Sequence, residues 1–410
     1  MAAYGGLRGV AEGGGNCLHI CGSLWNRQTG RRERPSAQAT ENRGPGMYNP
    51  LRWRDRLLVS RLGNLLRHYE VKDMRMQTGV RLSLILLAVI MALAIASAGA
   101  DYKVSKTWKP GGDGGWDYLT ADGPGHRLFI SRSTRVMVID TESGKQVGEI
   151  PDTAGVHGIA LDSETGRGFT SNGREDSVSV FDLKSLAVQK KIKVGSGPDA
   201  ILYDPFSKRV FTFNGKGHDT TAVDASKGEV VGKLELGGKP EFAATDEKGT
   251  VFVNIEDTSE MVAFDPQKLT VKSRWKLANC EEPTGLAIDR KNRRLFAGCG
   301  GNKKMVVVDA DSGKMVASLA IGDGCDATGF DAGLGLAFAS AGDGTITVIK
   351  EDGADKFSVA QTVATQKGAR TMAVDDKTHQ LYTVTANVGP RPERKMEPGS
   401  FVVLVVEAGH

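Results

Sequence analysis

A sequence repeat occurs seven times between Trp116 and Val406, and it constrains the fold more than any other feature. Each copy is an apolar strand that ends in Asp, a turn rich in Gly, Lys and Arg, and a second apolar strand. A spacing near 42 residues with strand patterning is typical of the four-stranded blades of propellers. The aspartates that close the first strands are Asp122, Asp162, Asp204, Asp246, Asp289, Asp331 and Asp375.

A second series of aspartates keeps the same spacing, at Asp140, Asp182, Asp224, Asp265 and Asp309. Each unit divides into four short strands separated by turn-forming Gly, Asp, Asn and Ser. In the second unit these are residues 158–161, 168–171, 177–181 and 188–194. The sequence therefore predicts an all-β fold, a seven-bladed β-propeller of four-stranded antiparallel blades spanning residues 101–410.

The ends of this domain indicate how the ring closes. Residues 102–109 resemble a fourth strand without the three that should precede it, and the last unit lacks a clear fourth strand after residues 401–406. We expect the N-terminal strand to complete the last blade, because pairing the two ends removes exposed strand edges.

The composition changes upstream of this domain. Residues 1–75 hold thirteen basic and six acidic residues and show no pattern long enough to fold alone. We interpret them as a basic leader that is absent from the mature protein, with Met76 as the initiator. A disordered basic extension is the alternative.

Residues 76–100 read as a secretory signal peptide. Arg81 precedes a charge-free apolar run over residues 84–96, and the small residues 97–100 form a cleavage site. Cleavage after Ala100 predicts a periplasmic or secreted protein with no stable membrane span, whereas an uncleaved anchor is the competing interpretation. Without both segments, whose charges are +7 and +1, the whole-chain charge of +4 becomes about −4.

Three cysteines lie in the repeat domain. Cys280 precedes the first strand of the fifth unit and Cys299 follows the second strand of the same hairpin, so both lie at one end of it. Export to an oxidising compartment favours a Cys280–Cys299 disulfide, with Cys299–Cys325 as the competing pair.

Several phrases of the repeat resemble the YVTN β-propeller repeat family, named for a Tyr-Val-Thr-Asn quartet. They are residues 169–172 (FTSN), 210–214 (VFTFN) and 382–385 (YTVT), with Gly-x-x-Pro lead-ins at 195–198 and 237–240. The resemblance covers residues 101–406 and departs from the quartet at 296–299 (FAGC) and 338–341 (FASA). It implies a bacterial or archaeal exported propeller from a family mostly without an assigned reaction.

The repeat also predicts a candidate site at one mouth of the central channel, because the first strand of every blade lines that channel. Four carboxylates, an imidazole and a guanidinium would meet there, and like charges repel by roughly 1 to 4 kcal/mol per close pair unless a partner relieves them. We predict binding of a small polar ligand, with Ca²⁺ as the one cofactor considered. The competing explanation is a wet channel mouth that binds nothing. The residues are Asp117, His157, Asp199, Glu241, Thr284, Asp326 and Arg370.

The loops between second and third strands should share the end of the ring that carries this mouth. We predict ligand or partner contacts there from Arg174, Asn214, His218, Arg391 and Arg394. The last two lie in the proline-rich segment 387–398, which is either a partner-binding loop or a solvated crossover.

These observations favour an exported, monomeric binding module that holds a protein, an envelope polymer or a small polar ligand. The alternative is a metal-assisted lactonase or lyase, with His157 as base beside a cation held by Asp199, Glu241 and Asp326. No nucleophile elbow, His-Glu-x-x-His motif or phosphate loop is found in the domain, which favours a non-enzyme. The net charge and the scarcity of paired aromatic and basic residues disfavour a nucleic-acid partner.

Overall fold

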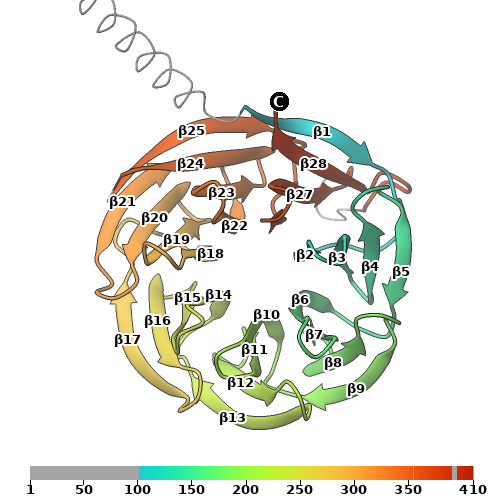
Figure 1. The fold of residues 1–410 in the computed structure, drawn as a ribbon, viewed down its shortest axis with the longest axis horizontal. Coiled ribbons are helices and arrows are strands. Elements are labelled where there is room, and N and C mark those ends of the chain that lie inside the picture. The colour runs from blue at the N-terminus through green and yellow to red at the C-terminus, as the bar shows by residue number, and fades with distance from the viewer. Residues whose placement is uncertain (1–100, 354, 390–394, 410) are drawn as a thin grey trace, which may run out of the picture. The chain divides into compact units, whose positions relative to one another are not determined.

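The computed structural model describes residues 101–353, 355–389 and 395–409, and within them it is all-β. The strands form seven antiparallel four-stranded sheets arranged as the blades of a propeller, which confirms the predicted fold (Figure 1). No helix long and apolar enough to cross a membrane occurs among these residues. The predicted leader and signal peptide, together with Arg391 and Arg394, lie outside them.

The strands are ordered within each blade from the centre of the ring outward, as Figure 1 shows. The innermost strands are β2 (Leu119–Asp122), β6 (Val156–Asp162), β10 (Pro198–Asp204), β14 (Pro240–Thr245), β18 (Pro283–Asp289), β22 (Cys325–Asp331) and β26 (Met372–Asp375). The second strands are β3 (Arg127–Arg132), β7 (Arg167–Asn172), β11 (Arg209–Asn214), β15 (Val251–Ile255), β19 (Arg294–Cys299), β23 (Leu336–Ala341) and β27 (Gln380–Thr385).

The two outer strands of each blade follow the same order. The third strands are β4 (Arg135–Asp140), β8 (Ser177–Asp182), β12 (Asp219–Asp224), β16 (Glu260–Asp265), β20 (Lys304–Asp309), β24 (Thr345–Gly353) and β28 (Val402–Ala408). The outermost strands are β5 (Gln146–Ile150), β9 (Val188–Lys193), β13 (Glu229–Glu235), β17 (Thr270–Lys276), β21 (Met315–Ala320), β25 (Lys356–Ala364) and β1 (Tyr102–Trp108). We number the blades 1 to 7 in the order of their innermost strands.

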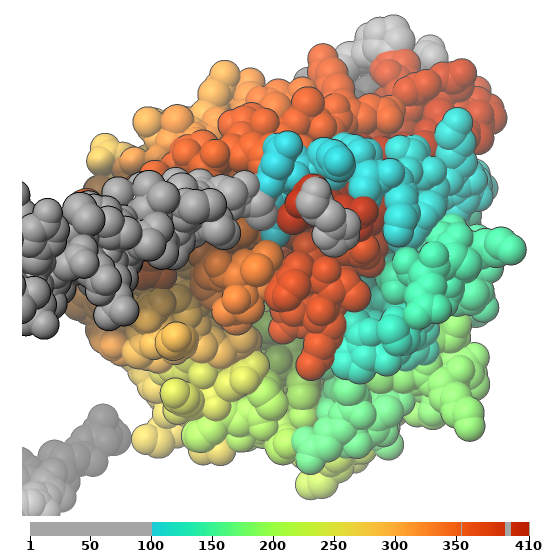
Figure 2. All heavy atoms as spheres, turned by 45° about the horizontal axis from the view of Figure 1, so that its top comes forward, coloured from blue at the N-terminus to red at the C-terminus, as the bar shows by residue number. Residues whose placement is uncertain are grey.

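The outermost strand of blade 7 comes from the other end of the domain. β1 pairs with β28 in antiparallel register, from Tyr102 opposite Ala408 to Trp108 opposite Val403. Figure 2 shows the cyan N-terminal residues against the red C-terminal ones on the outer surface. This pairing is the one that closure of the ring by the N-terminal strand requires, and closure itself stays a prediction.

The two series of aspartates that define the repeat have structural roles. Those that end the innermost strands are buried and accept hydrogen bonds from the following turn, as Asp289 does from the Lys291 amide at 2.9 Å. Those that end the third strands cap the next turn, as Asp309 does for the Ser312 amide at 2.9 Å. Because each aspartate satisfies the backbone of its own turn, the repeat in the sequence reflects turn geometry.

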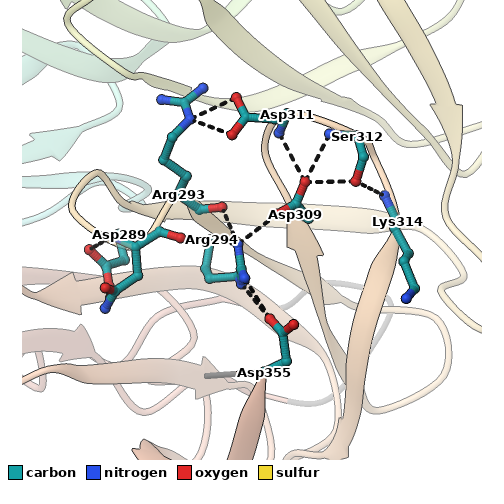
Figure 3. Close-up of polar contacts among 9 residues, drawn as sticks. Asp289, Arg293, Arg294, Asp309, Asp311, Ser312, Lys314 and Asp355 are labelled. Atoms are coloured by element: carbon teal, nitrogen blue, oxygen red, sulfur yellow. Dashed lines mark hydrogen bonds and ion pairs between the residues drawn. The ribbon is translucent and has the colours of Figure 1, made fainter. Parts of the chain in front are cut away.

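Arginines at the start of the second strands tie neighbouring blades together. Arg209 donates to the carbonyl oxygens of Pro266 and Gln267 in the next blade at 2.6 and 2.8 Å. Arg294 bonds to Asp309 of its own blade at 2.7 Å and to Asp355 of the next at 2.9 Å, as Figure 3 shows. These arginine side chains therefore contribute to the contacts between neighbouring blades.

The cysteine pairing follows the favoured prediction. Cys280 and Cys299 form a disulfide, and their Cα atoms are 5.2 Å apart. Cys325 is buried and unpaired, so the competing Cys299–Cys325 pair is not formed.

The two sets of loops predicted to share one end of the ring contact each other there. In blade 2 the Gly173 amide, between β7 and β8, donates to the Gly155 carbonyl, between β5 and β6, at 2.8 Å. Four further blades repeat this bond. The equivalent pairs are Gly215 with Gly197, Glu256 with Lys239, Gly300 with Glu282, and Gly342 with Gly324, each at 2.9 Å. We call this end of the ring the loop-bearing end.

Candidate functional site

The seven residues predicted to surround the channel mouth occupy equivalent positions at the loop-bearing end. In β6, β10, β14, β18 and β22 the residue is the second of the strand, and in blades 1 and 7 it lies two residues before the strand. The pairing register shifts directly at or after this position in all five of those strands. Such irregularities re-aim side chains near binding sites, so the innermost strands turn these residues away from regular sheet alternation.

Ionic contacts link the residues of blades 1, 2 and 3. The Nδ1 atom of His157 lies 2.6 Å from Oδ2 of Asp117 and 3.4 Å from Oδ1 of Asp199. All three side chains are partly exposed, between 21% and 37%. One imidazole therefore joins two carboxylates that are 82 residues apart in the sequence.

Arg370 extends these contacts to blades 6 and 7. Its Nε atom lies 3.2 Å from Oδ2 of Asp326, and one terminal nitrogen lies 4.0 Å from Oδ1 of Asp117. The side chain of Arg370 is half-exposed, which leaves part of its guanidinium open to solvent.

Blade 4 contributes Glu241 and a lysine that sequence reasoning did not include. Glu241 is buried, and Lys239 lies 2.8 Å from its Oε1 atom while also pairing with Glu256. Lys239 belongs to the Gly-x-x-Pro lead-in, so the signal was present in a phrase interpreted only as part of the repeat. We call Asp117, His157, Asp199, Glu241, Asp326, Arg370 and Lys239 the axial cluster.

Burial and mutual repulsion shift the pKa values of the carboxyl groups in this cluster. Desolvation, reinforced by the charge of Asp199, raises the pKa of Glu241 to about 8, and Lys239 offsets this in part. Desolvation also raises the pKa of Asp326 to about 6 against the opposing effect of Arg370. The pKa of Asp199 is raised by desolvation as well.

Burial and the neighbouring carboxylates act in opposite directions on the pKa of the imidazole. Burial lowers the pKa of His157, but the hydrogen bond with Asp117 and the charge of Asp199 outweigh burial, so the pKa is raised overall. The cluster therefore favours a cation at the position between these two carboxylates.

Hydrogen bonds within a blade and between neighbouring blades fix the backbones of Asp117 and Asp199. The Asp117 carbonyl accepts from the Thr371 hydroxyl of blade 7 at 2.8 Å, and the Asp117 amide donates to Ser131 Oγ at 3.0 Å. The Ser171 hydroxyl of blade 2 donates to the Asp199 carbonyl of blade 3. Because the backbones of Asp117 and Asp199 are fixed by these partners, their side chains need little reordering to meet a ligand.

Two aromatic side chains cross the centre of the ring beside the cluster. Tyr118 follows Asp117 and Phe242 follows Glu241, and their rings pack edge-to-face at 4.5 Å between centroids. They come from blades 1 and 4, which lie on different sides of the ring in Figure 1. Phe242 also packs against core clusters of several blades, so this pair fills part of the predicted channel.

The other five blades place no aromatic ring at this position. At the same position the other five blades carry Gly158, Ala200, Gly285, Ala327 and Thr371. A Cβ atom at Gly285 would meet the backbone nitrogen of Thr328 at 2.5 Å, so a side chain there would collide with the next blade. The channel mouth therefore combines the polar axial cluster with the Tyr118–Phe242 pair, and the sequence did not predict this aromatic contact.

Two of the predicted site residues form hydrogen bonds within the framework of the blades. The Thr284 side chain is buried and its hydroxyl donates to the Cys325 carbonyl at 2.8 Å, so it ties blades 5 and 6 together. Asn214 is fully buried at the end of β11, where its amide donates to Asp219 and Thr221 at 2.6 and 3.0 Å. The hydroxyl donor of Thr284 and the amide donors of Asn214 are therefore taken up by neighbouring strands.

The remaining predictions for the loop-bearing end are placed as follows. Arg174 and His218 are exposed on loops between second and third strands. A cavity of about 770 Å³ adjoins the axial cluster at Arg370, between the loops of blades 6, 7 and 1. Its lining includes Trp116, Gln366, Lys367, Asn387 and the glycines Gly115, Gly342, Gly368 and Gly389.

Comparison with known proteins identifies the fold class. No family model matches the chain, and no curated protein does so either. A chain of the structure titled "Crystal Structure of Mitotic Checkpoint Complex" has a TM-score of 0.64 at 10% identity, covering 76% of this chain and 94% of its own. The RRP9 WD40 repeats and U3-55K each show 8% identity, with TM-scores of 0.64 and 0.63, covering 76% and 75% of this chain and 98% of their own.

The class that the fold defines is therefore a seven-bladed propeller similar to WD40-repeat propellers. At these identities the likeness extends to the fold alone. The resemblance to the YVTN repeat family stays a prediction.

Proposed function

We propose that this protein is a binding module that holds a polar group in the axial cluster at its loop-bearing end. The observation that carries this proposal is the meeting of ionisable side chains from blades 1, 2, 3, 4, 6 and 7 on backbones fixed by neighbouring blades. Charged groups are costly to gather away from water without a partner, so such a cluster supports ligand binding.

The polar group is presented by a free small molecule, by a partner protein or by an envelope polymer. The cavity beside Arg370 gives room for parts of a ligand that extend beyond the axial cluster, and Lys367 and Arg370 offer positive charge there. The proposal includes export to the periplasm or the medium, which rests on the signal peptide expected at residues 76–100. N-terminal sequencing of the mature protein should begin at Asp101.

Binding experiments on the full chain test the proposal. Wild-type protein and the H157A/D199N double variant would be compared with H126N, which changes an exposed histidine between β2 and β3 that belongs to no predicted site. Thermal shift with a panel of amines, carboxylates and sugars tests small ligands, and co-sedimentation with purified envelope polymers and cross-linking on intact cells test the larger sources. We expect at least one ligand that H126N retains and the double variant loses; equal binding by all three proteins would refute the role of the cluster.

A metal-assisted lactonase or lyase is the second candidate function. It is favoured by one observation, the close approach of Asp117, His157 and Asp199, whose donor atoms lie within 4.8 Å of one another. A histidine that binds a cation through Nδ1 in this trio is occupied as a ligand, so another group would have to act as base. Turnover of a lactone panel by wild type, abolished in D199N, would establish this function over simple binding.

A further inference from the structure

We propose that Asp117, His157 and Asp199 form a site for a divalent transition-metal ion of the Zn²⁺ type. The inference deepens the proposed function, since the ion would lie inside the axial cluster and present an open coordination position to the ligand. It also differs from the calcium expectation drawn from the sequence, because the donor set contains a ring nitrogen.

The distances fit this ion with a small adjustment. One donor atom from each residue lies within 4.8 Å of the other two, with His157 Nδ1 at 2.6 Å from Asp117 and 3.4 Å from Asp199. Zinc binds nitrogen and oxygen at about 2.0 to 2.2 Å, so two ligands of a tetrahedral ion lie about 3.3 to 3.5 Å apart. The His157–Asp199 separation already has that value, and the His157–Asp117 separation must open by less than about 1 Å.

The chemistry of the donors selects the class of metal. Imidazole suits zinc, copper and nickel, whereas calcium and magnesium take oxygen ligands almost exclusively. Three protein ligands with a free fourth position are the usual arrangement of a zinc site that meets a second molecule. The three side chains keep 21% to 37% exposure, so the ion and its ligand can reach them from solvent.

The surrounding charge also favours a dication. Five carboxyl groups, those of Asp117, Asp199, Glu241, Asp326 and Glu256, gather around two cationic side chains, Lys239 and Arg370. In this partly desolvated space one divalent ion relieves repulsion among several carboxylates at once.

A separate observation concerns the orientation of the imidazole. A Cβ atom at Gly173 would lie 2.9 Å from both Cδ2 and Nε2 of His157, and 3.1 Å from the Pro198 carbonyl oxygen. A side chain at position 173 would press on the ring and on this loop, so glycine leaves room for the ring with Nδ1 directed at the two carboxylates. Gly173 is therefore a positioning residue, because it fixes the ring from the side opposite the proposed ion.

The test is metal binding by the full chain after dialysis against a chelator. Isothermal titration with ZnCl₂ should give one ion per chain, and CoCl₂ should produce the visible absorption of four- or five-coordinate cobalt. H157Q and D199N should each weaken Zn²⁺ binding at least tenfold and remove the cobalt absorption. H126N, the matched control, changes an exposed histidine between β2 and β3 and should behave as wild type, and circular dichroism of every variant verifies that the fold is intact.

G173A provides a second variant that leaves all three ligands in place. We expect it to weaken Zn²⁺ binding and change the cobalt spectrum by displacing the ring. Absence of stoichiometric binding in wild type, or H157Q binding with wild-type affinity, would overturn the inference. If wild type binds no metal but still binds a polar ligand through the cluster, only the metal inference fails. If it binds metal and no ligand, the proposed function fails instead.

Discussion

Replacing Glu241 by Gln should change how the stability of this propeller depends on pH. Glu241 is buried against the axis, and desolvation together with Asp199 raises its pKa to about 8. An acid whose pKa is raised in the folded state binds its proton more tightly there than in the unfolded chain. The stability it contributes is fully present below about pH 4.5 and is lost as the pH rises through about 8.

The size of the effect follows from the shift. Moving a carboxyl pKa from 4.5 to about 8 corresponds to at most about 5 kcal/mol between the two limits of pH, and partial relaxation around Lys239 reduces this to about 2 to 4 kcal/mol. Gln has no charge at any pH. E241Q should therefore gain about 2 to 4 kcal/mol relative to wild type between pH 5 and pH 9.

Urea unfolding followed by tryptophan fluorescence at pH 5, 7 and 9 measures this difference directly. Glu235 is an exposed glutamate at the end of outer strand β13, so E235Q controls for the loss of one negative charge at the surface. Parallel stability curves for E241Q and wild type over this range would refute the view that Glu241 is charged at a cost.

Three further predictions concern the framework that holds the cluster. R132A should lower the free energy of unfolding by about 3 to 5 kcal/mol, because the buried guanidinium stacks on Phe401 at 3.6 Å and donates to four carbonyl oxygens between residues 111 and 114; chemical denaturation measures this, and a loss below about 1 kcal/mol would contradict it. C280S should lower the free energy of unfolding by about 3 kcal/mol, the chain-entropy value for a disulfide with a sequence separation of 19. A reducing agent should destabilise wild type and leave the stability of C280S unchanged. Deleting residues 101–109 should expose the edge of β28 and cause aggregation, measured by light scattering; a monomeric, equally stable deletion protein would show that closure by this strand is not needed.

The blades could be predicted from the sequence because their signals are local. The second unit illustrates this, since strands expected at residues 158–161, 168–171, 177–181 and 188–194 form at 156–162, 167–172, 177–182 and 188–193. Short apolar runs bounded by turn-forming residues fix both ends of each strand. The repeated aspartates improve the prediction further, because each one satisfies the backbone of the turn that follows it.

The interior of the site could be predicted only in part. Equivalent positions in the repeat located every residue of the axial cluster except Lys239, but they did not show which predicted side chains keep their donors for a ligand. Thr284 donates to the Cys325 carbonyl of the next blade and Asn214 donates to the adjacent strand β12, and the Thr284 contact depends on spacing between blades that no single unit contains. The contact of Tyr118 with Phe242 likewise exists only once the ring has formed.

Arg132 shows a similar limit for charged residues. It stands at the end of β3, where the pattern indicates a loop exposed to solvent, yet its side chain is fully buried. The carbonyl groups that accept from its terminal nitrogens belong to a glycine-rich segment about 20 residues earlier, and sequence spacing gives no indication that this segment folds back over it.

The central claim is that side chains about 40 residues apart in the sequence meet at one end of the ring, and the pKa of His157 tests it most directly. A proton NMR titration of the imidazole in the full chain should give a value above the ordinary 6.5, because Asp117 and Asp199 both stabilise the protonated ring. In D117N and D199N the value should fall, while H126N, which removes an exposed histidine between β2 and β3, should leave it unchanged. A His157 pKa that is the same in wild type and in both variants would contradict the claim.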